Sequence, residues 1–211
     1  MPSIDLVIGT HRQNVQHIKE MKELYRILEA EIGLTESECE DFGTKLNRKK
    51  FEAKTSIIRE GNVANNLYFI ESGLLRTYHL NDGKEITTYF ACDKQFISSF
   101  SSFISRTASF ETLEAIEDSI VYELPHHVLA KLYTESRKFE KLGRILAERN
   151  YLCVLDRTYT MQTKTAKQKY LDFLKTYDKK IVQRVPQHQI ASFLGIAPES
   201  LSRVRKEISL S

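Results

Sequence analysis

Residues 187–208 read QHQIASFLGIAPESLSRVRKEI, and this stretch decides the fold of the last quarter of the chain. Two short helical segments, 186–194 and 198–209, flank a turn at 195–197 that contains a glycine. Both segments begin with proline, which is tolerated at a first helical position because that N–H has no partner within the helix. Glycine supplies the left-handed residue of a sharp turn. Two short helices joined in this way predict a helix-turn-helix.

The second segment is amphipathic. Its apolar residues recur at three- and four-residue steps and should pack on the first segment. The residues expected at this contact are Leu201, Val204 and Ile208 on one side and Ile190, Ala191 and Leu194 on the other. The opposite face carries Glu199, Ser202 and Arg203. Arg can donate two hydrogen bonds to guanine and Glu can accept one from cytosine, so this face predicts a DNA reader. Glu199 should also orient Arg203, and an ordinary surface ion pair between these two residues is the alternative interpretation.

The net charge of +3 is unevenly distributed. Residues 161–211 carry ten Lys or Arg and four Asp or Glu, a net of +6. The remaining residues 1–160 carry 21 basic and 24 acidic side chains, a net of −3. A basic C-terminal quarter on a mildly acidic body favours nucleic acid as the partner of that quarter.

Residues 51–124 have the texture of an antiparallel β structure. The segments TSIIREG, NNLYFIESG, LLRTYHL, KEITTYF and SIVYEL are short, rich in β-branched and aromatic residues, and separated by turn signals. Asp82-Gly83 between LLRTYHL and KEITTYF predicts a hairpin because both residues tolerate positive φ. Strands at this close spacing indicate a roll, barrel or sandwich. The segment 95–106, QFISSFSSFISR, suits a short helix packed against the roll.

Helical periodicity flanks the β-rich part on both sides. Residues 14–32 predict an amphipathic helix, and residues 1–20 are expected to form an N-terminal extension. Residues 136–160 predict a long helix with an apolar seam of near-heptad spacing. Such a seam usually needs a partner to cover it, so we expect a dimer, with burial inside its own domain as the alternative. A further helix, AKQKYLDFLKTY, and a short extended segment, IVQRV, lead to the helix-turn-helix.

The string at 187–208 resembles the helix-turn-helix of the Crp/Fnr family of bacterial transcriptional regulators. REGNVANNLYFIESGLLR is similar to the opening strands of that family's cyclic-nucleotide-binding roll, and the order of elements resembles the family from about Glu23 to Ile208. The run Glu-Ser-Leu-Ser-Arg at 199–203 resembles the E-x-x-S-R pattern of the Fnr-like branch. The resemblance implies that Glu199, Ser202 and Arg203 contact bases. It implies phosphate contacts for Gln187, His188, Ser200 and Lys206.

The effector pocket implied by the resemblance departs from the cyclic-nucleotide pattern. Binders of this fold share F-G-E followed by R-[ST]-A, in which Glu accepts from the ribose hydroxyl and Arg neutralises the phosphate. Here the first half reads Phe-Ile-Ser98-Ser99, without Gly-Glu. The second half falls on Ser109 in one register and on Arg106-Thr107 in another, and both registers stay open. The missing Gly and Glu argue against cyclic AMP as the effector.

Other cofactors and chemistries lack their residues. An iron–sulfur sensor needs a cysteine cluster, but Cys39, Cys92 and Cys153 lie far apart and form no CxxC. A metal site in a β-roll would need several His and a Glu converging from its strands, but His79 is the one His inside a predicted strand. We therefore expect no metal site and no cofactor. We find no nucleophile–base pair or phosphate loop, which argues against an enzyme. The chain shows neither a secretion signal nor an apolar membrane span, and its cysteine usage suits a reducing cytoplasm.

The sequence thus predicts an α+β protein with four parts: an extension (1–20), an antiparallel, jelly-roll-like β-roll effector domain (21–135), a dimerisation helix (136–160) and a helix-turn-helix DNA-binding domain (161–211). We expect a dimeric transcriptional regulator that binds double-stranded DNA at a pseudo-palindromic site, with RNA polymerase as a candidate further partner. Two alternatives stay open: a regulator that responds to a cyclic nucleotide, and a sensor or interaction protein of the same fold that binds DNA weakly.

Overall fold

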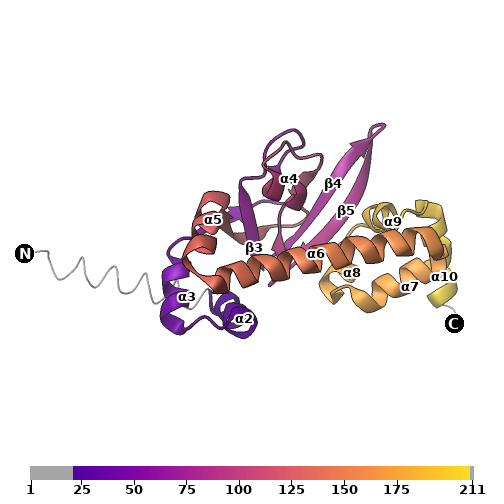
Figure 1. Cartoon of the computed structure of the whole chain (residues 1–211). Coiled ribbons are helices and arrows are strands. Elements are labelled where there is room, and N and C mark those ends of the chain that lie inside the picture. Colours follow the sequence, from indigo (N-terminus) through magenta and orange to yellow (C-terminus); the bar gives the residue numbers. More distant parts are fainter. Residues whose placement is uncertain (1–20, 210–211) are drawn as a thin grey trace, which may run out of the picture.

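The computed structural model describes residues 21–209 and has the predicted α+β architecture (Figure 1). Its strands are β1 (Asn47–Phe51), β2 (Ser56–Ile58), β3 (Asn66–Ser72), β4 (Leu74–Asn81), β5 (Lys84–Cys92), β6 (Phe96–Ile97), β7 (Thr112–Ala115) and β8 (Ser119–Pro125). They form two four-stranded sheets, in the orders β1-β8-β3-β6 and β2-β7-β4-β5, in which every pair is antiparallel. The predicted β-roll is confirmed.

The β4–β5 hairpin follows from its turn residues. Asp82 and Gly83 have φ values of 51° and 75°, and the pairing runs from Asn81↔Lys84 at the turn to Leu74↔Cys92 at the other end. A two-residue turn with positive φ at both positions matches the right-handed twist of the strands it joins. The Asp-Gly signal therefore located the longest hairpin of the roll.

Within residues 21–135, the structure describes four short helices that accompany the roll. They are α2 (Lys22–Ile32), α3 (Glu36–Gly43), α4 (Phe100–Ser105) and α5 (His126–Glu135). Gly33, in the left-handed conformation, ends α2, and Thr35 opens α3 with a capping box completed by Glu38. The predicted helix 14–32 is thus described only from Lys22 onward. Its first residues, and the predicted extension 1–20, lie outside the described residues.

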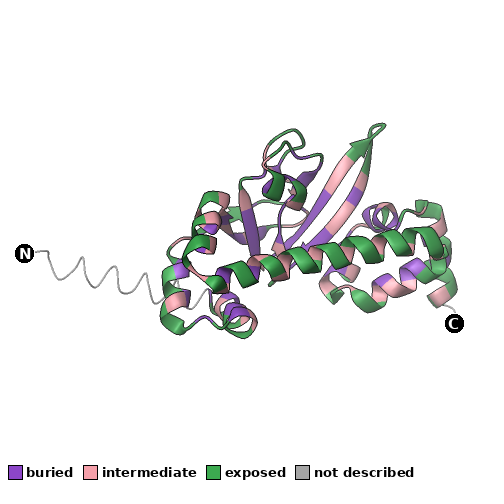
Figure 2. Ribbon diagram, viewed as in Figure 1, coloured by how far each residue is buried: buried purple, intermediate pink, exposed green. Residues whose placement is uncertain are grey.

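The long helix is α6 (Arg137–Thr163), which runs from the roll to the C-terminal helices (Figure 1). It ends three residues beyond the predicted boundary at 160, because no helix breaker precedes Thr163 and the next helix has its own cap at Thr165. Phe139 in its first turn is buried in the roll core. Its later part is largely exposed (Figure 2). Among residues 21–209, no helix has both the length and the apolar character that a membrane crossing requires.

Four helices form the C-terminal part: α7 (Ala166–Thr176), α8 (Lys179–Arg184), α9 (Gln187–Leu194) and α10 (Pro198–Ser209). The prediction of an extended IVQRV was wrong, because residues 179–184 form α8. Asp178 caps this helix by accepting a hydrogen bond from the Lys180 backbone N–H at 2.7 Å. Ile181 is buried in the core beneath it, so tertiary packing overrides the strand preference of β-branched residues. Pro186 lies one residue before α9 rather than within it.

Two apolar cores hold these parts together. One core fills the roll and includes α2, α3, α5 and the start of α6. The other core joins Leu74, Phe90 and Cys92 of the roll to α7, α8, α9 and α10. The C-terminal helices are therefore packed against the roll, in addition to being joined to it through α6. They share a core with the outer face of the β4–β5 hairpin.

Candidate nucleic-acid interface

The turn between α9 and α10 has the geometry of a helix-turn-helix. Gly195 ends α9 with φ 61° and ψ 40°, and its N–H donates to Ala191 and Ser192 carbonyls. The Ile196 N–H also donates to the Ala191 carbonyl, at 3.0 Å. Pro198 is the first residue of α10, where its missing N–H costs no helical hydrogen bond. Both helices predicted from 187–208 are confirmed.

The inner face of α10 is apolar, as predicted. Leu201 and Val204 are buried, and Ile208 packs against the same core at its edge. Their neighbours include Ile190 and Ala191 of α9. This packing fixes the orientation of α10 about its own axis, and so decides which residues point outward.

The outer face of α10 presents Glu199, Ser202 and Arg203, all of them exposed. In the described part of the chain, no ion pair joins Glu199 to Arg203, and neither side chain has another ion-pair partner. The expectation that Glu199 orients Arg203 is therefore not met. Among residues 21–209, neither side chain has a hydrogen-bond partner, so both can bond another molecule.

The predicted phosphate contacts lie on both helices of this unit. Gln187 and His188 are the first two residues of α9 and are exposed, as is Lys206 in the last turn of α10. Ser200 is half-buried. The first turn of a helix has N–H groups without intrahelical partners, which suits the start of α9 to a phosphate oxygen.

The helix-turn-helix docks on the roll through α9, which lies beside β5 (Figure 1). The Phe193 ring packs on the Phe90 ring with centroids 5.2 Å apart. The Ser192 hydroxyl accepts a hydrogen bond from the Thr87 N–H at 3.0 Å and donates one to the Glu85 carbonyl at 2.8 Å. One face of α9 is thereby packed against the roll, while the outer face of α10 and the start of α9 remain exposed.

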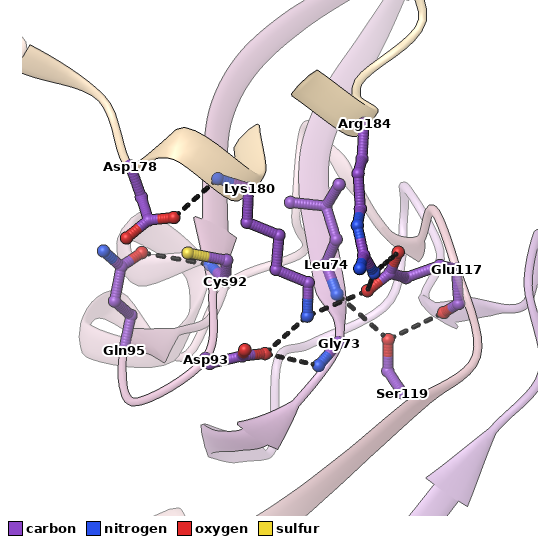
Figure 3. A network of polar contacts seen from close by, with 10 residues as sticks. All are labelled: Gly73, Leu74, Cys92, Asp93, Gln95, Glu117, Ser119, Asp178, Lys180 and Arg184. Atoms are coloured by element: carbon purple, nitrogen blue, oxygen red, sulfur yellow. Dashed lines mark hydrogen bonds and ion pairs between the residues drawn. The ribbon is translucent and has the colours of Figure 1, made fainter. Parts of the chain in front are cut away.

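A cluster of ion pairs extends this docking through α8 (Figure 3). The Lys180 ammonium lies 2.6 Å from Asp93 and 2.9 Å from Glu117, and Arg184 lies 3.0 Å from Glu117. Asp93 also accepts a hydrogen bond from the Gly73 N–H at 2.7 Å. Burial opposes the charged form of Glu117, but hydrogen bonds from Lys180 and Arg184 hold its pKa below the usual value.

A cavity of about 490 Å³ lies between the roll and α6. Its polar lining includes Thr77, Thr88, Ser98 and Glu111 from the roll, with Arg157 from α6. Glu111 is only 8% exposed and accepts a hydrogen bond from the Thr88 hydroxyl at 2.7 Å. A buried carboxylate at this position repels a phosphate group. Among residues 21–209, no three His, Cys, Asp or Glu side chains gather as metal ligands.

Comparison with known proteins identifies the architecture. Residues 48–136 match the family described as cyclic nucleotide-binding domain. FixK2 from Bradyrhizobium japonicum superposes with a TM-score of 0.71 at 19% identity, over 78% of this chain and 85% of that one. A protein assigned to the Crp/Fnr family from Eubacterium rectale superposes with a TM-score of 0.65 at 22% identity, over 84% of each chain. The chain has the Crp/Fnr fold.

Another structure with the Crp/Fnr fold is CLP of Xanthomonas campestris, described as a c-di-GMP responsive global regulator. It superposes with a TM-score of 0.64 at 19% identity, over 82% of this chain and 90% of that one. Among curated proteins, no sequence relative is found. At these identities the likeness establishes the fold and leaves ligand and partner to be argued from the residues.

Of the pocket residues predicted from the sequence, the structure places some at the cavity and others away from it. Ser98 lines the cavity and donates to the Asn66 carbonyl, while the hydroxyls of Ser99 and Ser109 bond each other at 2.8 Å. Arg106 points elsewhere: its guanidinium donates to the Ala64 carbonyl and the Asn65 side chain. Thr107 bonds Ser105. The two residues that follow Ser109, Phe110 and Glu111, line the cavity, whereas Ser109 itself does not.

Glu111 and Arg157 line the cavity but are not among the residues predicted from the sequence. The register that begins at Ser109 could have pointed to Glu111, because the third position of R-[ST]-A then falls on this residue. Arg157 carried no signal, because it lies 69 residues from its strand partner Thr88 and looks like any polar residue of a long helix.

Proposed function

We propose that this chain is a sequence-specific, DNA-binding transcriptional regulator that acts as a dimer. The observation that carries the proposal is the outer face of α10, where Glu199, Ser202 and Arg203 are exposed. Leu201 and Val204 anchor the opposite face of the helix. A helix held in this way presents an acceptor, a hydroxyl and a two-pronged donor, which is the set that reads base edges in the major groove.

Base and phosphate contacts have separate roles in this proposal. Arg203 donates to guanine O6 and N7, Glu199 accepts from a cytosine amino group, and Ser202 supplements them. Phosphate contacts set the register of the protein on the duplex and carry no sequence information directly. They are assigned to Gln187, His188, Ser200 and Lys206. The charge of +6 on residues 161–211 supplies the electrostatic attraction.

The dimer is proposed to form along α6. Large apolar side chains are exposed on its second half, among them Leu152 at 62%, Leu155 at 46% and Tyr159 at 61%. These three recur at steps of three and four residues, as in a two-helix seam. A two-fold axis along the seam would bring each residue near its counterpart. The two copies of α10 would then enter successive major grooves ~34 Å apart, which requires a pseudo-palindromic site.

Cyclic AMP is not the proposed effector. The cavity lacks the Gly-Glu of the nucleotide cassette, Arg106 is bonded away from it, and Glu111 places a negative charge within it. We propose binding rather than catalysis as the activity, in the cytoplasm. RNA polymerase is a candidate partner of the DNA-bound dimer, and the effector of the cavity is a separate question.

The test is selection of bound duplexes from random DNA, followed by titration of variants on the selected operator. Arg203→Ala should weaken binding by about 1–3 kcal/mol and relax the preference at one base in each half-site. Lys206→Ala should weaken binding to all sequences alike and reduce the salt slope by about one. Lys141→Ala, an exposed residue of α6 near the roll, is the control and should bind as the wild type does.

Each of the two alternatives has its own outcome. If no sequence is enriched in the selection, the chain is an interaction or sensor protein of the same fold. If cyclic AMP raises the melting temperature of the protein, the exclusion of this effector is wrong. A ligand at 100 times its dissociation constant would stabilise the protein by ~2.7 kcal/mol, which a thermal melt detects.

A further inference from the structure

Arg157 of α6 is bonded to the roll and packed on the helix-turn-helix at the same time. Its guanidinium donates to the backbone carbonyls of Thr87, at 2.9 Å, and of Thr88. The same guanidinium lies over the Phe193 ring of α9, 4.7 Å from the ring centroid. A planar guanidinium suits this position because it can donate two hydrogen bonds in its plane and stack with its face. One side chain therefore joins α6, β5 and α9.

Arg157 also lines the 490 Å³ cavity, beside the strand residue to which it is bonded. Thr88 connects the two sides. Its carbonyl accepts from Arg157, while its hydroxyl donates to Glu111 and lies 2.6 Å from the Thr77 hydroxyl. A molecule in the cavity would meet these same hydroxyls. Any change in their hydrogen bonds would act on the strand that Arg157 holds.

When α9 docks on the roll, the outer face of α10 stays exposed. The docked surface of α9 includes Ser192 and Phe193, whereas Glu199, Ser202 and Arg203 on α10 remain exposed. Because α10 packs on α9, the position of α9 on β5 also sets the position of the reader relative to α6. In a dimer joined along α6, this docking fixes the distance between the two readers.

We propose that Arg157 is the positioning residue that couples the cavity to the DNA-reading helix. When the Arg157 guanidinium bonds the carbonyls of β5 and stacks on Phe193, the two α10 helices of the dimer are held at the spacing that the operator requires. A cavity ligand with an uncharged carbonyl oxygen would compete with those carbonyls for the guanidinium and shift the docking equilibrium. The change in the free energy of docking equals the difference between the ligand's binding free energies for the docked and undocked states. This inference rests on the proposed DNA-binding function.

The first test compares Arg157→Met and Arg157→Lys in the full chain on the selected operator. Methionine keeps most of the stem but has no donors, and lysine keeps the charge but not the fork. We expect Arg157→Met to weaken operator binding by about 5- to 150-fold, the usual range of coupling between sites. Binding to random DNA and the salt slope should stay unchanged, because no phosphate contact is lost. Lysine should fall between methionine and the wild type.

The matched control is Arg149→Met, two helical turns earlier on α6, where the side chain pairs with Glu31 of α2 at 2.6 Å. It should bind operator as the wild type does. Amide hydrogen exchange supplies a readout of docking: exchange in β5 and α9 should rise in Arg157→Met alone. Operator affinity within two-fold of the wild type for both Arg157 variants would overturn the proposal. So would an equal loss of affinity for operator and random DNA.

The link to the cavity is tested by Thr88→Val, which removes a cavity hydroxyl and leaves the backbone carbonyl in place. In a double-mutant cycle on operator affinity, Thr88→Val should have a smaller effect in the Arg157→Met background than in the wild-type background. Additive effects would show that the cavity does not act through Arg157. The two proposals fail differently. If the wild type selects no operator, the proposed function fails; if it selects one that Arg157→Met binds equally well, only this inference does.

Discussion

Replacing Lys180 with methionine should lower the free energy of unfolding by about 1–2 kcal/mol, a value set by the surroundings of the lost charge. The Lys180 side chain is 17% exposed, whereas Asp93 and Glu117 are 40% and 27% exposed. An exposed pair is worth about 0–1 kcal/mol, and breaking a fully buried one costs about 3–5 kcal/mol. The loss falls between these limits because Asp93 keeps its bond to the Gly73 N–H and Glu117 keeps Arg184.

The assay is thermal and urea unfolding of the full chain. For a chain of this size the expected loss corresponds to a melting temperature lower by about 2–8 °C. The control is Lys179→Met, one residue earlier on α8, where the side chain is exposed. It should stay within about 0.5 kcal/mol of the wild type. If Lys180→Met and Lys179→Met unfold alike, the cluster in Figure 3 does not stabilise the docked arrangement.

Three further predictions concern other parts of the chain. The pKa of Glu117 is lowered and that of Lys180 is raised, so their ion pair contributes its full stability between about pH 4.5 and 10.5. The contribution is lost as the pH falls through the folded-state pKa of Glu117 or rises through that of Lys180. The difference in unfolding free energy between wild type and Lys180→Met, measured by urea unfolding, should therefore vanish at both pH extremes. Gly73→Ala should cost about 2–4 kcal/mol in urea unfolding, because φ is +134° and a Cβ would lie 2.1 Å from the Ser119 hydroxyl; a loss below about 1 kcal/mol would contradict this. Leu155→Lys should yield folded monomers in sedimentation equilibrium, and an unchanged dimer would place the interface elsewhere.

The parts of the fold that local chemistry determines could be predicted from the sequence. Gly195 and Pro198 specify the turn between the reading helices, and Asp82-Gly83 specify the hairpin, because each acts on its own backbone dihedrals. The apolar spacing of α10 likewise predicted its buried and exposed faces. The residues of the reading face therefore follow from the spacing of apolar side chains, although their contacts with DNA stay a prediction.

Features that depend on distant parts of the chain could not be predicted. Ile181 and its neighbours look like a strand in isolation, and only the docking of α8 on the roll makes them helical. The docking itself has no signature in the sequence, because Ser192 and Phe193 are ordinary residues of an amphipathic helix. The same holds for Arg157, whose partners Thr87 and Thr88 are brought to it by the whole fold.

The place of β5 in its sheet gives the docking a further consequence. With the order β2-β7-β4-β5, it is an edge strand, and an edge strand offers unpaired N–H and C=O groups to the strands of other molecules. Ser192 and Arg157 occupy four of these groups from the side, at Glu85, Thr87 and Thr88, as a neighbouring strand would. A fragment that ends after α6 would lose the Ser192 bonds and the cover of α9. We expect it to self-associate through β5, so α9 also protects the chain from aggregation.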